Sequence, residues 1–336
     1  MIKNNIGIIG FGNVGKKHYL EFLRNKDFCK VKAICDFDKK KIRYLKKNFS
    51  HIKIYKNSED LINDSEINTV SICSYDHFHY DQMYQCFIKN KNVFCEKPIC
   101  SNYQEFLKLS KNLFKSKVFL GTNFNLRSAE SFKVLKKKIM KKQLGKIFHV
   151  EAGYESGRLF KIKDGWRGKN KDYSLVHGGM IHMIDLVMWI LNFFEQKRDY
   201  EVFTQGNNIC SEHFDYKNYD FITSSVKSKK LIINFKASWG CVTPHFHSLK
   251  IYGTKGTFIN DFKYKGYFSK KLKLKFEKDK FDYEDRNRGE TIKNFLEQIK
   301  QKKLMNKKKK EILKTTELSM AIQESLLKKK RIKINL

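Results

Sequence analysis

A glycine-rich segment near the N-terminus constrains the fold of this chain more than any other feature. Residues 6–15 read Ile-Gly-Ile-Ile-Gly-Phe-Gly-Asn-Val-Gly, an apolar strand that runs into G-x-G-x-x-G at a helix start. In this spacing Gly10 permits a tight turn, Gly12 lets the backbone approach a pyrophosphate, and Gly15 allows close packing of helix on strand, while the helix N-terminus attracts the anion. We therefore expect a dinucleotide to contact Gly10, Phe11, Gly12, Asn13 and Val14.

The first third of the chain alternates short apolar strands with amphipathic helices, which is typical of a doubly wound parallel sheet. The predicted strands are Ile6–Ile9, Val31–Cys35, Thr69–Cys73 and Asn92–Cys95, and helices begin near Val14, Lys39 and His79. A helix over Tyr103–Lys115 and a strand over Val118–Gly121 would complete a Rossmann domain spanning residues 1–121.

Residues 122–336 show a different pattern, with extended runs separated by glycine and polar residues, which favours a mainly antiparallel sheet in an α+β domain. The predicted strands are Ile147–Tyr154, Asp220–Val226, Leu231–Ser238 and Leu249–Tyr252. Helices that would cover one face are Phe132–Lys142, Met180–Phe194, Thr291–Gln301 and Thr315–Lys330. The lysine run Lys307–Lys310 lies between two helical segments and is expected to form a solvated loop.

Composition narrows the class of protein. With 41% hydrophobic residues, 336 residues can bury two ordinary cores. No window approaches the roughly 18 uninterrupted apolar residues of a membrane span, and the first residues lack a signal-peptide pattern, so we expect a cytoplasmic protein. The eight cysteines form no CxxC pair or zinc-ligand spacing, so we expect reduced thiols and no metal.

The formal net charge of +34 would ordinarily suggest a nucleic acid or an anionic membrane as partner. The charge is spread along the whole chain, however, and lysine greatly outnumbers arginine, whereas phosphate and base recognition favours the arginine fork. We therefore expect no specific nucleic-acid partner. Acidic small molecules such as nucleotide sugars or uronic acids would be attracted.

The second predicted strand ends in Asp36, about twenty residues beyond the glycine loop. A carboxylate at this point can accept hydrogen bonds from the ribose hydroxyls of the adenosine, and it repels a 2′-phosphate, which favours NAD. Lys39, Lys40 and Lys41 lie close enough to keep NADP as an alternative. A glycine turn without a nucleotide, or a flavin site, is the competing interpretation.

The segment Asn92–Pro98 is an apolar strand that ends in Glu96-Lys97-Pro98, at the edge where open α/β sheets bind ligands. Together with the glycine loop, this motif resembles the glucose-fructose oxidoreductase, inositol dehydrogenase and MocA family. The resemblance continues through nearly the full length, in the segments Asn123–Arg127, Leu144–Ile147, Gly165–Arg167 and His182–Leu186.

The resemblance implies that Lys97 lies between nicotinamide and substrate and donates a hydrogen bond to the reacting oxygen during hydride transfer. A lysine desolvated at a strand end can also have its pKa lowered toward neutrality, while Glu96 beside it favours the charged form. A salt-bridged structural lysine is the alternative. Other residues expected to border the cofactor are Glu96, Ser74, Asp76, His77 and His79, although those after the fourth strand could instead cap the next helix.

His182 is the second catalytic candidate, because an imidazole can carry the hydroxyl proton that hydride transfer releases. Asp185, near the same helical face, could orient that imidazole or bind a substrate hydroxyl. Inositol-dehydrogenase-like members carry an aspartate four residues before this histidine. This chain has Gly178 there, with His177 beside it, so the proton relay is left open; core packing is the alternative role for His182.

Three arginines are informative because this chain uses lysine almost everywhere that a simple positive charge would serve. Arg127, Arg158 and Arg167 could supply planar forks for hydroxyls, a carboxylate or a phosphate, while Tyr154 or Trp166 packs on a sugar face. Structural ion pairs are the competing explanation for each arginine.

These observations favour a nicotinamide-dependent dehydrogenase or reductase that acts on a secondary alcohol or ketone of a sugar, cyclic polyol or nucleotide sugar. The resemblance further implies a homo-dimer or homo-tetramer, with contacts through the second sheet. A noncatalytic nicotinamide-binding sensor or assembly subunit is the main alternative, and a basic nucleic-acid-binding protein is a weaker one.

Overall fold

The computed structural model describes residues 4–336 except 114, 171–172, 196, 215, 217, 270–275, 281, 283, 285–286, 288 and 302–304. The chain forms two compact units. The first comprises Met1–Asn125 with Arg288–Leu313, and the second comprises Leu126–Asn287 with Lys314–Leu336. Among the described residues, no helix is long and apolar enough to cross a membrane.

The first unit is built on a six-stranded parallel sheet in the order β3-β2-β1-β4-β5-β6, which confirms the predicted doubly wound fold. Its strands are β1 (Asn4–Ile9), β2 (Cys29–Cys35), β3 (Lys53–Tyr55), β4 (Thr69–Ile72), β5 (Asn92–Cys95) and β6 (Leu120–Thr122). Its helical segments are α1 (Asn13–Arg24), α2 (Lys39–Asn48), α3 (Ser58–Asn63), η1 (Asp76–Phe78), α4 (His79–Ile88), α5 (Tyr103–Leu113) and α10 (Glu290–Gln301). The short helix η2 (Asn125–Ser128) has its first residue in this unit and the others in the second. Strand β3 and helix α3 were not predicted from the sequence.

Helix α10 belongs to the first unit, although the sequence analysis placed everything after residue 121 in a second domain. Its apolar face joins the core formed by β1, β2 and β5. The Phe295 ring lies 5.4 Å from the ring of Phe94 on β5, and a side chain at Gly121 would clash with it. The amphipathic pattern of this helix identified a helix but not the sheet on which it packs.

The second unit is built on a nine-stranded sheet in the order β14-β13-β12-β11-β7-β10-β9-β8-β15. Every pairing is antiparallel except that of β10 with β7, which confirms a mainly antiparallel sheet. Its strands are β7 (Ile147–Glu155), β8 (Asp199–Asn207), β9 (Phe221–Ser228), β10 (Leu231–Ser238), β11 (Phe246–Gly253), β12 (Gly256–Asn260), β13 (Lys265–Ser269), β14 (Phe276–Lys278) and β15 (Ile332–Asn335).

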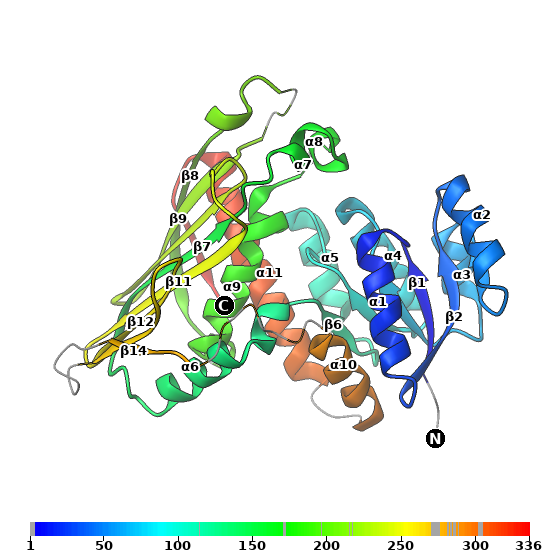
Figure 1. Cartoon of the computed structure of the whole chain (residues 1–336), viewed down its shortest axis with the longest axis horizontal. Coiled ribbons are helices and arrows are strands. Elements are labelled where there is room, and N and C mark those ends of the chain that lie inside the picture. The colour runs from blue at the N-terminus through cyan, green and yellow to red at the C-terminus, as the bar shows by residue number, and fades with distance from the viewer. Residues whose placement is uncertain are drawn as a thin grey trace. The chain divides into compact units, whose positions relative to one another are not determined.

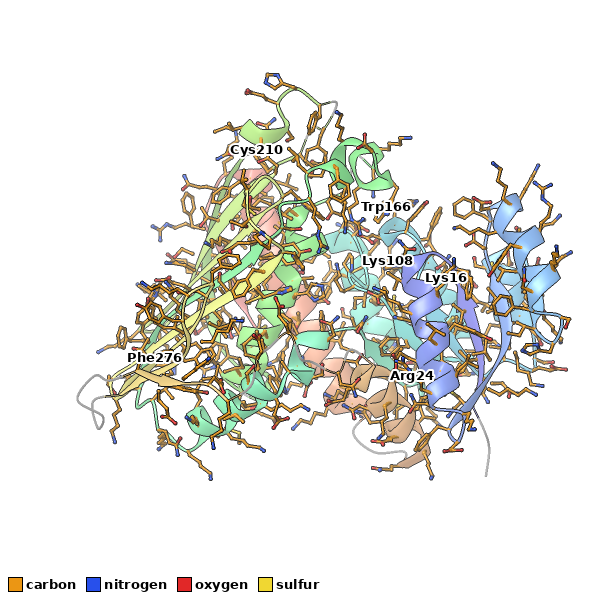
Figure 2. The ribbon with its side chains drawn as sticks, in the orientation of Figure 1. Lys16, Arg24, Lys108, Trp166, Cys210 and Phe276 are labelled. Carbon is orange, nitrogen blue, oxygen red and sulfur yellow. The ribbon has the colours of Figure 1, made fainter. Side chains whose placement is uncertain are left out.

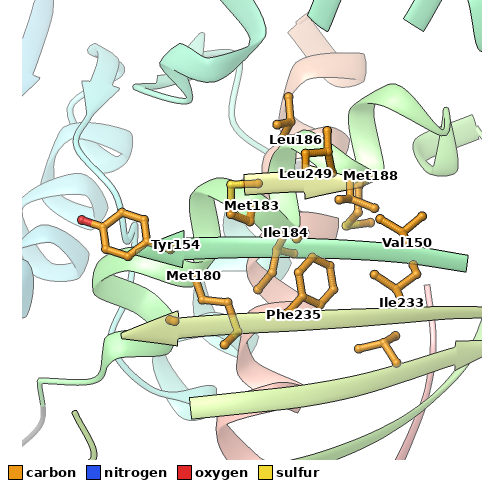
Figure 3. Packing of buried hydrophobic residues seen from close by; sticks show 14 of the residues in the cluster. Val150, Tyr154, Met180, Met183, Ile184, Leu186, Met188, Ile233, Phe235 and Leu249 are labelled. Carbon is orange, nitrogen blue, oxygen red and sulfur yellow. The ribbon is translucent and has the colours of Figure 1, made fainter. Parts of the chain in front are cut away.

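Helices cover one face of this sheet, as Figure 1 shows for α9 and α11. The helical segments are α6 (Glu130–Met140), α7 (Phe160–Lys163), α8 (Trp166–Lys169), the π-helical turn η3 (Val176–Met180), α9 (Ile181–Ile190), η4 (Phe193–Glu195), η5 (Ile209–Ser211) and α11 (Met305–Lys328), which contributes residues to both units. Strand β9 alternates buried and exposed residues because only one of its faces meets the core. Met183 and Ile184 of α9 pack with Phe235 and Leu249 in that core (Figure 3).

The predicted loop at Lys307–Lys310 is wrong, because these residues lie inside α11. Lys309 is fully buried, and its ammonium donates hydrogen bonds to the carbonyl oxygens of Leu113 and Ser116 at 3.0 and 2.7 Å, past the end of α5. Burial lowers the pKa of Lys309 to about 8. Most other cations are exposed, and Figure 2 shows nitrogen-tipped side chains over the outer surfaces of both units, as expected from charge spread along the whole chain.

Candidate functional site

The glycine loop after β1 has the geometry of a phosphate cradle. Gly10 has φ +86°, and a Cβ there would lie 2.7 Å from the carbonyl group of Cys73. A Cβ on Gly15 would lie 2.0 Å from the carbonyl oxygen of Gly10, so α1 packs directly on the turn. A Cβ on Gly12, by contrast, would meet no atom within 4 Å. The loop is therefore open at the position where a pyrophosphate would approach the N-terminus of α1.

Asp36 ends β2 and is tied to this loop. Its Oδ2 accepts hydrogen bonds from the backbone N–H of Phe11 at 2.9 Å and the ammonium of Lys41 at 3.2 Å. The carboxylate side chain is only 2% exposed. Asp36 thus sits where the sequence analysis expected a ribose-binding carboxylate, with its charge balanced by Lys41.

A small cavity of about 270 Å³ lies beside the glycine loop, and three lysines are among the residues that line it. Its lining residues are Phe11, Lys16, Lys40, Lys41, Tyr44 and Leu45. The ring of Phe37, the residue after Asp36, is 68% exposed and lies 5.9 Å from the ring of Tyr75, which follows β4. Neither aromatic residue was predicted. The exposed face of Phe37 could stack on an adenine ring, because aromatic faces favour such contacts.

The loop after β4 is fixed from behind by His79. This side chain is fully buried, and its ring nitrogens lie 2.7 Å from the carbonyl oxygen of Pro98 and 3.1 Å from that of Ser74. The Ser74 hydroxyl donates to Gln82 at 2.7 Å. His79 was predicted to contact the cofactor. In the structure it is buried and links the loops that follow β4 and β5. Asp76 and His77 form the short helix η1.

Glu96 is held by a buried network that the sequence analysis missed. His18 on α1 places its Nε2 at 3.0 Å from Glu96 Oε1, and its Nδ1 lies 2.9 Å from the Ser71 hydroxyl and 3.1 Å from the Cys73 sulfur. The amide of Asn123 donates to the same Glu96 oxygen at 2.8 Å. The histidine three residues after Gly15, on the inner face of α1, is the signal that could have revealed this network.

The charges of this network are mutually stabilised. Burial opposes a charge on His18, but its contacts with Cys73 and Glu96 outweigh burial and raise the pKa of the imidazole to about 10. Burial likewise works to raise the pKa of Glu96, but His18, Asn123 and the nearby charge of Lys97 lower it to about 2. At neutral pH the pair is therefore an imidazolium and a carboxylate.

Lys97 follows Glu96 directly, and both are half-buried at the carboxyl end of β5. The Lys97–Pro98 peptide is cis. Because β5 lies next to β4, and β4 next to β1, Lys97 stands at the same sheet edge as the glycine loop. This edge is the topological switch point of a doubly wound sheet, where such folds bind ligands.

In the second unit, His182 belongs to a cluster of rings around Tyr154 at the end of β7. The Tyr154 ring is nearly parallel to that of His182 at 6.3 Å between centroids, and lies 5.0 Å from His245 and 5.4 Å from His247. Tyr154 is 8% exposed and His182 is partly exposed. The two histidines from the start of β11 were not predicted, because they lie about ninety residues from Tyr154 in the chain.

The π-helical turn η3 carries His177 and Gly178 into α9. His177 is buried. A Cβ on Gly178 would lie 2.1 Å from the hydroxyl oxygen of Tyr173, so this tyrosine occupies the space that a side chain at position 178 would need. Position 178, where inositol-dehydrogenase-like members carry an aspartate, thus has no room for a side chain beside Tyr173. π-helical turns of this kind often occur at functional sites.

Arg127 and Asp185, both predicted as substrate ligands, instead bind each other. The guanidinium of Arg127 reaches Asp185 through Nε and Nη2 at 2.7 and 2.5 Å, and the Thr315 hydroxyl donates to the same carboxylate at 3.2 Å. Asp185 is 1% exposed. The structural ion pair, which was the competing explanation, describes these two residues, because a buried carboxylate requires a partner. Asp185 therefore is not free to meet a substrate.

Arg158 and Arg167 are placed differently. Both are half-buried, and no described carboxylate lies within ion-pair distance of either guanidinium. The guanidinium carbon of Arg167 lies 4.6 Å from the ring centroid of Trp166 and 5.8 Å from that of Tyr173. Burial raises the pKa of Tyr154, while the charges of Arg167 and Arg158 act to lower it. These two arginines therefore border the ring cluster.

The described residues contain no group of three or more His, Cys, Asp or Glu side chains that could hold a metal ion. All eight cysteines are free thiols. Burial raises the pKa of Cys35 and Cys86 to about 12, so these thiols are protonated and unreactive near neutral pH. A hollow of about 610 Å³ over β7, β10 and β11 contains none of the predicted site residues.

Comparison with known proteins identifies relatives for both units. The model of the oxidoreductase family with an NAD-binding Rossmann fold matches residues 4–124, and that of the GFO/IDH/MocA C-terminal domain matches residues 132–259. The myo-inositol 2-dehydrogenase of Thermotoga maritima is 26% identical over 269 residues, which cover 76% of this chain and 75% of that enzyme. Glucose-6-phosphate 3-dehydrogenase of Bacillus subtilis is 26% identical over 192 residues, or 55% and 53% of the two chains.

Solved structures show the same fold. The scyllo-inositol dehydrogenase of Lactobacillus casei, solved with NAD(H) and scyllo-inositol, superposes with a TM-score of 0.74 at 18% identity over 99% of both chains. The two family models together match most of the chain, and the sheet order and glycine cradle agree with them. The resemblance stated from the sequence is therefore confirmed: this chain belongs to the Gfo/Idh/MocA family of oxidoreductases, with an NAD-binding Rossmann domain followed by that family's C-terminal domain.

Proposed function

We propose that this oxidoreductase transfers hydride to or from a secondary alcohol or ketone of a sugar, cyclic polyol or nucleotide sugar. One observation carries the proposal: the open glycine cradle after β1 and the half-buried Lys97 after β5 lie at the same edge of one parallel sheet. The relatives named as inositol and glucose-6-phosphate dehydrogenases support a sugar-like substrate.

The residues of the cradle fit NAD. The open backbone at Gly12 and the N-terminus of α1 would hold the pyrophosphate, and Asp36 would accept hydrogen bonds from the adenosine ribose. When bound, the nicotinamide supplies the hydride acceptor or donor. Lys40 and Lys41 in the adjoining cavity keep NADP as a second possible cofactor.

Lys97 is the proposed catalytic residue. Its ammonium would donate a hydrogen bond to the oxygen of the reacting carbon, which stabilises the negative charge that grows on this oxygen when a ketone is reduced. In the oxidising direction the same group favours loss of the hydroxyl proton. The network of His18, Glu96 and Asn123 would keep the strand end, and so Lys97, in one position.

His182 is the proposed proton carrier. Its partly exposed ring lies parallel to that of Tyr154, and a neutral imidazole can accept the released proton. Position 178 holds a glycine where inositol-dehydrogenase-like members carry an aspartate, and Asp185 is bound by Arg127. Neither position therefore supplies a carboxylate that orients the His182 ring. Trp166, Arg158 and Arg167 remain proposed substrate contacts.

The proposal is tested by comparing wild type with Lys97→Ala in two assays. Fluorescence titration with NADH should give similar dissociation constants for both proteins, while turnover at the nicotinamide absorbance band, screened with sugars, inositols and nucleotide sugars, should fall about 100-fold or more in the variant. Lys108→Ala, an exposed lysine on α5, is the matched control. NADH binding with no turnover across the panel would instead favour a noncatalytic sensor.

The assembly and location of the protein stay predictions. We expect a homo-dimer or homo-tetramer, which light scattering coupled to size exclusion would measure directly. The expected cytoplasmic location can be checked by fractionating cells that express the full chain.

A further inference from the structure

The ring cluster around Tyr154 is unusually rich in groups that carry or can carry positive charge. Three histidine rings surround this tyrosine, at 5.0 Å for His245, 5.4 Å for His247 and 6.3 Å for His182. His245 also lies 4.7 Å from His247. All of these rings belong to the second unit, and they come from β7, α9 and the β11 region.

Two arginines that pair with no acidic side chain in the described part of the chain add to this cluster. Arg158 and Arg167 are half-buried, and their charges act on the Tyr154 hydroxyl. A partly desolvated guanidinium without a carboxylate is costly, and such a group is normally retained with a counterion. The guanidinium carbon of Arg167 lies 4.6 Å from the ring centroid of Trp166, within the range of a cation–π contact. The counterion is therefore expected to come from outside the described residues.

This cluster receives no carboxylate from Asp185, Glu155 or position 178. Asp185 is buried against Arg127. Glu155, next to Tyr154, lies on the opposite side of β7 and binds Lys236 at 2.7 Å. Position 178 is a glycine whose space is filled by Tyr173. A guanidinium only donates hydrogen bonds, so an anionic acceptor matches it better than a hydroxyl, which must also donate.

From this arrangement we infer that the substrate carries an oxyanion, a carboxylate or a phosphate, bound by Arg158 and Arg167. The planar fork of each guanidinium can donate two parallel hydrogen bonds to such a group. The reacting hydroxyl or ketone of the same molecule would lie toward His182. This inference rests on the proposed dehydrogenase function, because it names the substrate class of that site.

Matched substrate pairs test the inference. Initial rates with NAD are compared for glucose against glucuronate, glucose against glucose 6-phosphate, and glucose against UDP-glucuronate. The acidic member of at least one pair should have a kcat/KM about 10–100-fold higher, the range expected for hydrogen bonds to a charged group. Preference for glucuronate would indicate a carboxylate, for glucose 6-phosphate a phosphate monoester, and for the nucleotide sugar alone a diphosphate.

Arginine variants locate the contact. Arg158→Ala and Arg167→Ala should each lower kcat/KM for the acidic member about 10–100-fold, mainly through KM, and should lower kcat/KM for the neutral member by a smaller factor. Arg331→Ala is the control, because this arginine of the second unit is 69% exposed and pairs with Glu201. Equal turnover of neutral and acidic members, or unchanged KM values in both variants, would overturn the inference.

Calorimetric titration of the NADH complex separates this inference from the proposed function. If no substrate turns over, binding of glucuronate, glucose 6-phosphate or UDP-glucuronate that is lost in Arg158→Ala and Arg167→Ala still supports the oxyanion site. If none of these three compounds binds, the inference is wrong whatever the fate of the dehydrogenase proposal.

Discussion

Replacing His18 with leucine should destabilise the first unit by leaving a buried carboxylate without its main partner. In the wild type the Glu96 side chain is 14% exposed and accepts hydrogen bonds from His18 and Asn123. Removing one member of a buried ion pair typically costs about 3–5 kcal/mol. The pKa of His18, raised from 6.5 to about 10, corresponds to about 5 kcal/mol at 1.36 kcal/mol per unit. Because Cys73 contributes part of that shift, we expect about 3 kcal/mol.

The unfolding free energy lost in His18→Leu should be largest at one pH and smaller above and below it. In the wild type the pKa of His18 is raised on folding, so its contribution is complete below pH 6.5 and is lost as the pH rises through about 10. In His18→Leu, the buried Glu96 carboxylate should have a raised pKa, and its penalty is relieved as it becomes protonated at lower pH. The difference in unfolding free energy between the two proteins should therefore peak near about pH 6 and shrink on both sides.

Two spectroscopic signals can assign the loss to one unit. All three tryptophans, Trp166, Trp189 and Trp239, lie in the second unit, so their fluorescence reports its unfolding in urea, whereas far-ultraviolet circular dichroism reports both units. The His18→Leu substitution should shift the circular-dichroism transition more than the fluorescence transition. The double variant with Glu96→Gln should lose less than the single variant. A pH-independent loss, or simple additivity in the double variant, would refute the ion-pair reasoning.

Three further outcomes are expected. Asp185→Asn removes the carboxylate from the buried guanidinium of Arg127 and should lower the unfolding free energy reported by tryptophan fluorescence by about 3–5 kcal/mol; a loss under about 1 kcal/mol would show that the pair is replaceable. Gly178→Asp should cost about 1–3 kcal/mol by overpacking against Tyr173, with partial recovery on adding Tyr173→Ala, and no recovery would place the clash elsewhere. Lys41→Ala should weaken NADPH binding about tenfold more than NADH binding in fluorescence titrations; equal weakening would mean that this lysine does not meet a 2′-phosphate.

Local patterns allowed the cofactor half of the molecule to be predicted from the sequence. The glycine spacing at Gly10–Gly15, the acid at Asp36 and the position of Lys97 at a strand end all appear where the structure has them. Each depends on interactions within a few residues or on the two-residue and 3.6-residue periodicities of strands and helices. A parallel sheet follows from their alternation, because consecutive strands must be joined by crossover helices.

Partners distant in the chain could not be predicted in this way. Residues expected to bind substrate, Arg127 and Asp185, are 58 positions apart and neutralise each other. A lysine expected in solvent, Lys309, is buried and donates hydrogen bonds to carbonyl oxygens about 195 positions away. The periodicity of a sequence indicates which face of a helix or strand is buried, but not which segment covers that face. Only tertiary packing therefore decided these pairings.

The sequence by itself determined the class of fold, the dinucleotide cradle and the proposed catalytic lysine, since backbone geometry and strand ends are local properties. Only the tertiary structure decided that His18 sustains Glu96 in its charged form, and that Arg158 and Arg167, unlike Arg127, meet no acidic side chain among the residues that the structure describes. The physical reason is the same for both: the cost of burying a charge depends on what surrounds it, and those surroundings are assembled from segments that meet only on folding.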